Sequence, residues 1–453
     1  MTVREDIVKV AARIRANLAP EKAAQLRAIL SEQHPADLAD AMLFLNEKED
    51  TAVFKTLTIS EAAEALDEVD NSTEARLLQV TSPDRLADIL EEMPADKGAE
   101  VVGALSDSEV NHLLTLTDAE TAREIRLLLA YPKDTAGRIM SLDYVDVPDT
   151  ATQADALNRF REKKEAEHIF FVYVVDAQGG LCGMIDLRSL LSAPPNALVR
   201  DLMVEEVIAV HPESDQEQVA RVFARYDLTA LPVVSAAPES RLLGVITSDD
   251  AIDVMQAERD EDVAHMSGSD AQELENKSPA QVAKLRMPWI MATMFIELLA
   301  GVVIHYFDKT LTKYILLASF MPIISAISGN TGLQSAAIII RGLSTGHVQL
   351  AHWKHAVIRQ VTTTLILGGA CALVLGTIGA IWDRHWIFGL TVFLGMFLAV
   401  NIAGVVGTIV PLLSKRAGFD PALTAGPFET AFQDVVGISI FLSLASLMLN
   451  WLK

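Results

Sequence analysis

Cysteine is scarce in this sequence, and its scarcity excludes a fold held together by disulfides. The chain has two cysteines, Cys182 and Cys371, which lie in separate regions and imply no disulfide framework. The first residues also lack the apolar core of a cleavable secretory signal. We therefore expect the soluble part of the chain to stay in the cytoplasm.

Basic residues are also in deficit, with 37 Lys and Arg against 60 Asp and Glu. Nucleic-acid binding needs a basic surface, so this acidity argues against a nucleic-acid partner. The sequence shows no zinc-ligand spacing and no glycine loop of the kind that cradles phosphate. No nucleophile stands beside a candidate general base, so an enzyme is not the favoured interpretation.

The charge is divided unevenly along the 453 residues, which exceed one hydrophobic core. Residues 1–286 carry 28 basic and 54 acidic side chains, a net charge of −26, whereas residues 287–453 carry 9 and 6, a net charge of +3. Apolar residues still make up 51% of the chain. This division predicts an acidic soluble part followed by a membrane domain.

The soluble part divides again by pattern. Residues 1–137 read as short amphipathic helices, and the segment 34–40 recurs loosely as 82–88, each opening with a capping residue and a proline. Such repetition predicts an α-helical superhelical domain. Residues 138–198 and 199–257 then each show strand, turn, strand and helix, which is typical of an α/β unit. The two units resemble a tandem pair of cystathionine-β-synthase (CBS) domains, and a charged connecting helix is predicted over 258–286.

Residues 287–453 contain five apolar segments that each meet or approach the length of a membrane-spanning helix. They cover 288–307, 314–340, 356–382, 386–413 and 422–450. Seven basic residues fall on one side of the membrane and, by the positive-inside rule, mark it as cytoplasmic: Lys284, Arg286, Arg341, Lys354, Arg359, Lys415 and Arg416. His347, His352 and His355 share a loop on that side, and we interpret them as interfacial rather than as metal ligands.

Asp434 is a lone carboxylate inside the last apolar segment. A charge near mid-bilayer costs roughly 2.5–3.5 kcal/mol on insertion scales and is usually kept because it pairs with a conducted ion or proton. The alternative is an interfacial carboxylate at a helix end. We interpret Glu297, Asp308 and Glu429, the other acids near the membrane, as mouth or interface residues.

The second apolar segment contains Gly329, Asn330 and Gly332. Two glycines beside an asparagine could loosen the helix and free carbonyl groups along a water-filled path. Close helix packing through small residues explains the same pattern without an ion. Together with Asp434, these groups supply the oxygen ligands that Mg²⁺ prefers, and two copies of Asp434 on a dimer axis would match its charge.

A run of acids ends the second CBS unit and opens the connecting helix: Asp249, Asp250, Asp253, Glu258, Asp260, Glu261 and Asp262. Like charges at helical spacing repel unless cations intervene. The run therefore suggests a cation-sensing switch, although an ordinary solvated acidic helix is the alternative.

The order of these regions, with the segments 131–140, 329–334 and 426–434, resembles the MgtE family of magnesium channels. The resemblance implies a homodimeric, multi-pass channel in the bacterial plasma membrane, with its pore on the two-fold axis. Asp434 matches the pore ion site, and Asn330, with Gly329 and Gly332, matches the pore lining. The family fold comprises a helical N-domain, a CBS pair, a connecting "plug" helix and five membrane helices.

The resemblance also implies that intracellular Mg²⁺ bridges the N-domain, the CBS pair and the plug helix and thereby closes the pore. The matching acids are Asp96, Asp227, Asp250, Asp253, Glu258, Glu261 and Asp262. The second CBS unit keeps Thr247 and Asp250, which often contact a nucleotide ribose, so adenine nucleotide is a further candidate ligand. Two other functions stay open: transport of another divalent cation such as Co²⁺ or Mn²⁺, and a membrane-anchored nucleotide sensor.

Overall fold

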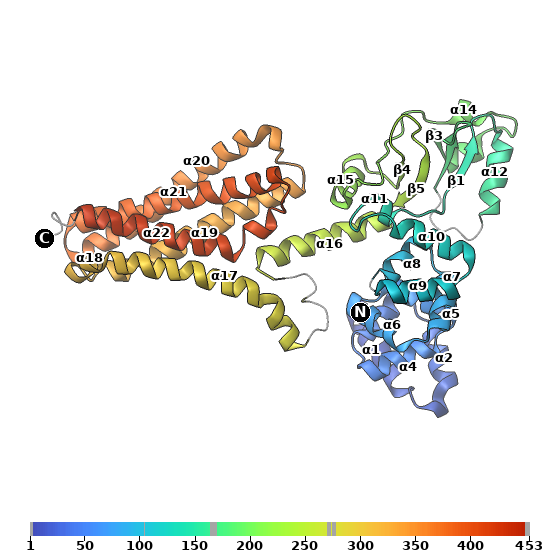
Figure 1. The fold of residues 1–453 in the computed structure, drawn as a ribbon, viewed down its shortest axis with the longest axis horizontal. Helices are drawn as coiled ribbons and strands as arrows, with labels where there is room; N and C mark the ends of the chain where they lie inside the picture. The colour runs from blue at the N-terminus through green and yellow to red at the C-terminus, as the bar shows by residue number, and fades with distance from the viewer. Residues whose placement is uncertain (1–2, 104, 164–169, 270–272, 274–277, 449–453) are drawn as a thin grey trace. The chain divides into compact units, whose positions relative to one another are not determined.

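The computed structural model describes residues 3–103, 105–163, 170–269, 273 and 278–448 (Figure 1). The chain forms two units, Met1–Gln256 and Ala257–Lys453, and each is described by itself.

Unit 1 begins with ten helices that pack on alternate neighbours along the chain, so that α1 contacts α3, α3 contacts α5 and α5 contacts α7. Their bounds are α1 (Val3–Ala16), α2 (Ala23–Leu30), α3 (Pro35–Met42), α4 (Glu47–Thr56), α5 (Ile59–Glu68), α6 (Asn71–Val80), α7 (Pro83–Glu92), α8 (Ala95–Val102), α9 (Asp107–Leu116) and α10 (Ala119–Leu129). Capping boxes at Asn46 and Thr58 begin α4 and α5.

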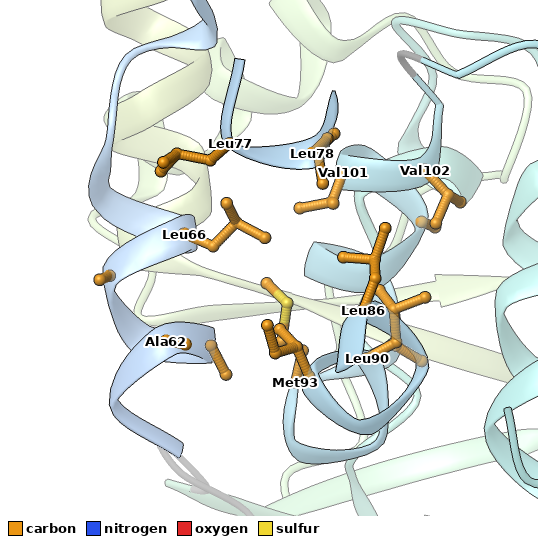
Figure 2. Packing of buried hydrophobic residues seen from close by; sticks show 14 of the residues in the cluster. Ala62, Leu66, Leu77, Leu78, Leu86, Leu90, Met93, Val101 and Val102 are labelled. Carbon is orange, nitrogen blue, oxygen red and sulfur yellow. The ribbon is translucent and has the colours of Figure 1, made fainter. Parts of the chain in front are cut away.

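One apolar core joins these helices. Leu66 of α5, Leu77 of α6 and Leu90 of α7 are buried in a single cluster (Figure 2). Each helix is too short to be stable alone in water, so burial of one apolar face is what holds the series together. The predicted α-helical superhelical N-domain is therefore confirmed.

The two CBS units follow, and they are related in topology. In the first, β1 (Val145–Pro148) pairs in parallel with β2 (Phe171–Val175), which pairs antiparallel with β3 (Leu181–Asp186). In the second, β4 (Ala230–Val234) pairs antiparallel with β5 (Leu242–Thr247). A parallel bridge between Val210 and Val233 corresponds to the parallel pairing of β1 with β2 in the first unit. The remaining helices are α11 (Ala136–Ile139), α12 (Gln153–Glu162), α13 (Leu187–Ser192), α14 (Val199–Leu202) and α15 (Gln216–Tyr226). Residues 164–169 of the first unit lie outside the described residues.

Helix α16 (Ser248–Met266) runs from the second CBS unit through the start of the predicted connecting helix without interruption. It ends next to Gly268, whose φ of +68° no longer fits a right-handed helix. Residues 270–272 and 274–277 of the predicted connecting helix lie outside the described residues. Residues 279–286 belong instead to the first long membrane helix.

In the described residues of unit 2, five long apolar helices form most of the structure, as predicted. They are α17 (Pro279–Tyr306), α19 (Leu317–Ser344), α20 (Trp353–Asp383), α21 (Trp386–Ala417) and α22 (Pro427–Met448), with the short α18 (Asp308–Lys313) after α17. Helix α21 packs against α19, α20 and α22, whereas α17 packs mainly on α22. Most apolar side chains of α17 are exposed in the single chain.

Candidate ion-conduction and regulatory sites

Asp434 lies on α22 at a point where two other membrane helices approach it. Ser325 Oγ, on α19, donates a hydrogen bond of 2.6 Å to Asp434 Oδ1. Glu297, on α17, which packs on α22, is close enough to Asp434 for the two carboxyl groups to interact. Asp434 is half-buried in the single chain, so three helices bring oxygen atoms to a place that is still open on one side.

The sequence alone predicts a mouth or interface position for Glu297 and does not relate this residue to Asp434, so sequence reasoning misses the pairing. The position of Glu297 inside the first apolar segment is the signal that could have raised the question. Two adjacent carboxylates repel one another, and a cation or a shared proton relieves that repulsion. Among the described residues, no three acidic, histidine or cysteine side chains converge as metal ligands. A cation here would therefore draw further ligands from water or from a second chain.

The glycines of α19 do not break the helix. Helix α19 is continuous from Leu317 to Ser344, so the predicted loosening is wrong. A Cβ on Gly329 would lie 3.1 Å from Thr430 Cγ2 of α22, and a Cβ on Gly332 would lie 2.6 Å from Glu429 Oε1. The two glycines thus let α22 pack closely on α19. Asn330 is exposed on the single chain, and its predicted pore-lining role stays a prediction.

Glu429 is not at a mouth or interface, and that interpretation is wrong. The residue is 3% exposed, within the helices of one chain. Glu429 Oε1 lies against Gly332 of α19 and Gly407 of α21, where a Cβ on either glycine would come within 2.6 Å of it. Both its carboxyl oxygens and both amide atoms of Gln433, one turn along α22, make no hydrogen bond of good geometry, although the two side chains are close enough to interact.

In unit 1, several of the acids assigned to regulation surround one lysine. Lys97 Nζ of α8 lies 3.2 Å from Asp250 Oδ1, 3.6 Å from Asp67 Oδ1 and 4.0 Å from Asp253 Oδ2. Asp250 Oδ2 also accepts a 2.7 Å hydrogen bond from Thr247 Oγ1. The N-domain and the second CBS unit therefore meet at a cluster of carboxylates that shares a single ammonium group.

The cluster extends into buried carboxylates that are difficult to ionise. Burial, reinforced by the charge of Asp250, raises the pKa of Asp96 to about 7, and Asp96 Oδ1 has no hydrogen-bond partner. Burial and the charges of Glu100 and Asp67 raise the pKa of Glu74 to about 8. Burial also raises the pKa of Asp67 and of Glu100. Sequence reasoning found Asp96 through the family resemblance and missed Asp67, Glu74, Lys97 and Glu100, because their proximity arises from packing between distant segments.

Asp227 lies apart from these contacts. It follows the last residue of α15 in the left-handed conformation, with φ +51°, and its side chain is exposed. Its predicted role as a magnesium ligand stays a prediction.

The C-terminal end of α16 rests on the cytoplasmic ends of the membrane helices within unit 2. Ser344 Oγ of α19 donates to Asp262 Oδ2 at 2.9 Å. His265 Nδ1 lies 2.9 Å from Asp420 Oδ2, in the loop between α21 and α22, and His265 Nε2 lies 3.8 Å from Glu261 Oε1. Glu258 is half-buried one turn earlier. Asp420 and Ser344 are contacts that sequence reasoning did not find.

Apolar packing supports the same contact. Met266 packs against a buried cluster of Ala336, Ile340, Ala422 and Ala425. A Cβ on Gly426 would lie 2.9 Å from the carbonyl oxygen of Met266, so glycine at this position permits the approach. The end of α16 is thus held both by polar groups and by close backbone packing.

Comparison with known proteins identifies the chain. Residues 321–444 match the family model described as MgtE, divalent cation transporter, residues 33–134 match the MgtE intracellular N domain, and 136–196 and 199–257 match the CBS domain. The chain is 33% identical over 432 residues to the magnesium transporter MgtE of Thermus thermophilus, covering 94% of this chain and 95% of the relative. It is 30% identical over 431 residues to that of Bacillus subtilis, covering 95% of each. The chain belongs to the MgtE family.

A solved structure supports the fold of the soluble part. The cytosolic domain of the Mg²⁺ channel MgtE in complex with ATP is 35% identical, with a TM-score of 0.51, and the match covers 54% of this chain and 99% of that one. As an MgtE family member with five long apolar helices among its described residues, this chain is a multi-pass membrane protein whose N-terminal part is cytoplasmic.

Proposed function

We propose that this MgtE family member is a homodimeric Mg²⁺ channel that cytosolic Mg²⁺ closes. The observation that carries conduction is the meeting of Asp434, Glu297 and Ser325 from three membrane helices. All three offer oxygen atoms, which suit Mg²⁺, and Mg²⁺ retains much of its water shell. Relatives of similar length are named magnesium transporters.

The incompleteness of the site in one chain supports the proposed homodimer. Asp434 is half-exposed and Asn330 is exposed on the helices that would face a pore. Two chains related by a two-fold axis would place these groups opposite their counterparts. They would also cover part of the apolar surface of α17, which one chain leaves exposed.

Closure by cytosolic Mg²⁺ is proposed from the two acidic contact regions at either end of α16. At one end, carboxylates of the N-domain and the second CBS unit share Lys97. At the other, Asp262 and His265 hold the helix to groups at the cytoplasmic ends of α19 and of the α21–α22 loop. Divalent cations would neutralise the first region and favour the closed arrangement, and without them repulsion would open it. Binding of adenine nucleotide at the second CBS unit stays a prediction. Thr247 and Asp250, the two residues that would contact the ribose, are hydrogen-bonded to each other in this structure.

Asp434→Asn tests conduction. The amide keeps the shape and removes the charge, so we expect uptake of Mg²⁺ into proteoliposomes to fall at least a hundredfold, with the protein still eluting as a dimer. Asp308→Asn, at the exposed start of α18, is the control and should retain uptake. Unchanged flux through Asp434→Asn would refute the conduction site, and a competition series with Co²⁺ and Mn²⁺ would show whether another divalent cation is preferred.

A further inference from the structure

A cavity of about 580 Å³ opens between the ends of α19 and α20 that lie on the cytoplasmic side. The loop that forms its rim is folded back onto the helix rather than extended. Val348 N donates a 2.8 Å hydrogen bond to Gly342 O, and a Cβ on Gly342 would lie 2.5 Å from Val348 Cγ2. Val348 also packs with Ile339 and Leu343. The cavity is therefore preformed in the single chain.

The polar wall of the cavity combines basic side chains with the neutral Thr345, Gln349 and Gln360, and it contains no acidic side chain. Arg341 of α19 and Arg359 of α20 line it together with His347, His352 and His355. No acidic residue occurs anywhere between Asp308 and Asp383, in a chain whose net charge is −23. Within the part of the chain that the structure describes, neither guanidinium forms an ion pair. Unpaired arginines that converge on a cavity are typical of a site for phosphate.

The other wall of the cavity is apolar, and Ile338, Ile339, Val348 and Ala356 line it. Ile338 lines the cavity and is 59% exposed, on a helix that spans the membrane. Trp353, at the start of α20, is 39% exposed, a position at which tryptophan commonly marks the membrane interface. A soluble anion would use the arginines but would gain nothing from the apolar wall. A ligand with an anionic head and an acyl chain would use both.

We propose that this cavity binds the head group of an anionic phospholipid from the cytoplasmic leaflet. Basic pockets between membrane helices on that side bind such head groups. Each arginine near an anionic lipid surface contributes roughly fivefold in affinity. Loss of both arginines should therefore weaken retention of the lipid by more than tenfold.

Native mass spectrometry of the full-length protein tests the site. The protein is released from membranes containing equal phosphatidylglycerol and phosphatidylcholine, and the bound lipids are counted. Wild type should retain phosphatidylglycerol selectively, and the double variant Arg341→Gln/Arg359→Gln should lose that selectivity by tenfold or more. The matched control Lys354→Gln/Arg416→Gln removes two charges from the same membrane side at positions that do not line the cavity, and it should stay within twofold of wild type.

Two further measurements separate the sources of phosphate and do not depend on the variants. In wild-type protein stripped of lipid, hydrogen exchange at residues 345–352 should slow when phosphatidylglycerol is added and stay fast with phosphatidylcholine. Inorganic phosphate should give no such protection. Equal protection by inorganic phosphate, equal protection by phosphatidylcholine, or equal lipid loss in both double variants would each overturn the proposal.

Discussion

Lys97 occupies the place among three carboxylates that a bound cation would otherwise fill. Burial opposes its charged form, but the negative charges of Asp250, Asp67 and Glu100 raise its pKa overall. A single ammonium cannot neutralise all the carboxylates around it, so the cluster has unmet negative charge. That surplus is the physical basis of the proposed response of this region to a divalent ion.

Lys97→Met should destabilise the contact between the N-domain and the second CBS unit in the absence of Mg²⁺. Removing one partner of a mostly buried ion pair costs about 3 kcal/mol. Because the variant has a more negative cluster, Mg²⁺ should restore most of the loss. Protease resistance of the full-length protein, with chelator and with millimolar Mg²⁺, measures both effects. Lys97→Arg keeps the charge and serves as control, and a loss that Mg²⁺ leaves unchanged would contradict the prediction.

Glu74 gives unit 1 a pH dependence of known sign. Its pKa is raised from 4.5 to about 8 in the folded chain, so the folded state binds more protons than the unfolded state between these values. Glu74 therefore lowers stability progressively as the pH rises through that window. Glu74→Gln should raise the free energy of local opening by about 2 kcal/mol at pH 9, below the full linkage value because buried acids relax toward water.

The gain from Glu74→Gln should largely vanish at pH 5, where the native glutamic acid is already protonated. Hydrogen exchange of the amide groups of α6 and α8 measures this gain in the free energy of local opening. The exchange rates are corrected for the effect of pH on exchange in an unfolded chain. Glu64→Gln on the exposed face of α5 is the control and should change little at either pH. A gain of equal size at both pH values would show that the carboxyl group of Glu74 is not the cause.

At the scale of the element, the end of α16 is positioned by a backbone approach as much as by charge. Gly426→Ala would place a methyl group 2.9 Å from Met266 O. Overpacking of this kind typically costs 1–3 kcal/mol, and the lower part of that range changes the equilibrium of the contact about tenfold. We expect the Mg²⁺ concentration for half-inhibition of flux to rise about tenfold. Gly369→Ala, where a Cβ would meet nothing within 4 Å, should leave inhibition as in wild type. Equal inhibition of both variants would contradict a closing role for this contact.

Elements with a strong local pattern could be predicted from the sequence, and contacts between elements could not. The five membrane helices follow from long apolar runs, and the CBS strands follow from short apolar runs bounded by turns. The continuity of α16 across the predicted domain boundary carries no local signal. The burial of Glu429 was missed because it depends on Gly332 and Gly407, which belong to two other helices and leave room for the carboxylate only when all three helices pack.

At the scale of the whole molecule, the proposed gating requires that cation binding to the cytosolic carboxylates change the arrangement of the pore helices. Asp434 was found from sequence because a charge in an apolar run is conspicuous, whereas Glu297 beside it required the fold. The predicted regulatory acids divide between the two units, with Asp96, Asp227, Asp250 and Asp253 in unit 1 and Glu258, Glu261 and Asp262 in unit 2. Helix α16 carries residues of both groups.

The triple variant Glu258→Gln/Glu261→Gln/Asp262→Asn should conduct Mg²⁺ yet resist closure by internal Mg²⁺. These side chains supply negative charge on α16, and neutralising them removes the groups through which Mg²⁺ would act. Flux into proteoliposomes with internal Mg²⁺ varied is the measurement, and inhibition should weaken at least tenfold. The control Asp84→Asn/Asp88→Asn/Glu92→Gln removes three exposed acids from α7 and should be inhibited normally. Wild-type inhibition of the triple variant would count against the switch.

The polar side chains of α22 also bear on how the protein is made. Glu429, Gln433 and Asp434 fall within two turns of one membrane helix, and α19 and α21 bury the first two. Partitioning such a segment into lipid by itself carries a penalty of several kcal/mol. Synthesis delivers α22 after α19 and α21, the helices that cover it. The burial of these polar groups therefore favours insertion of α22 against helices that are already in the membrane over insertion into lipid alone.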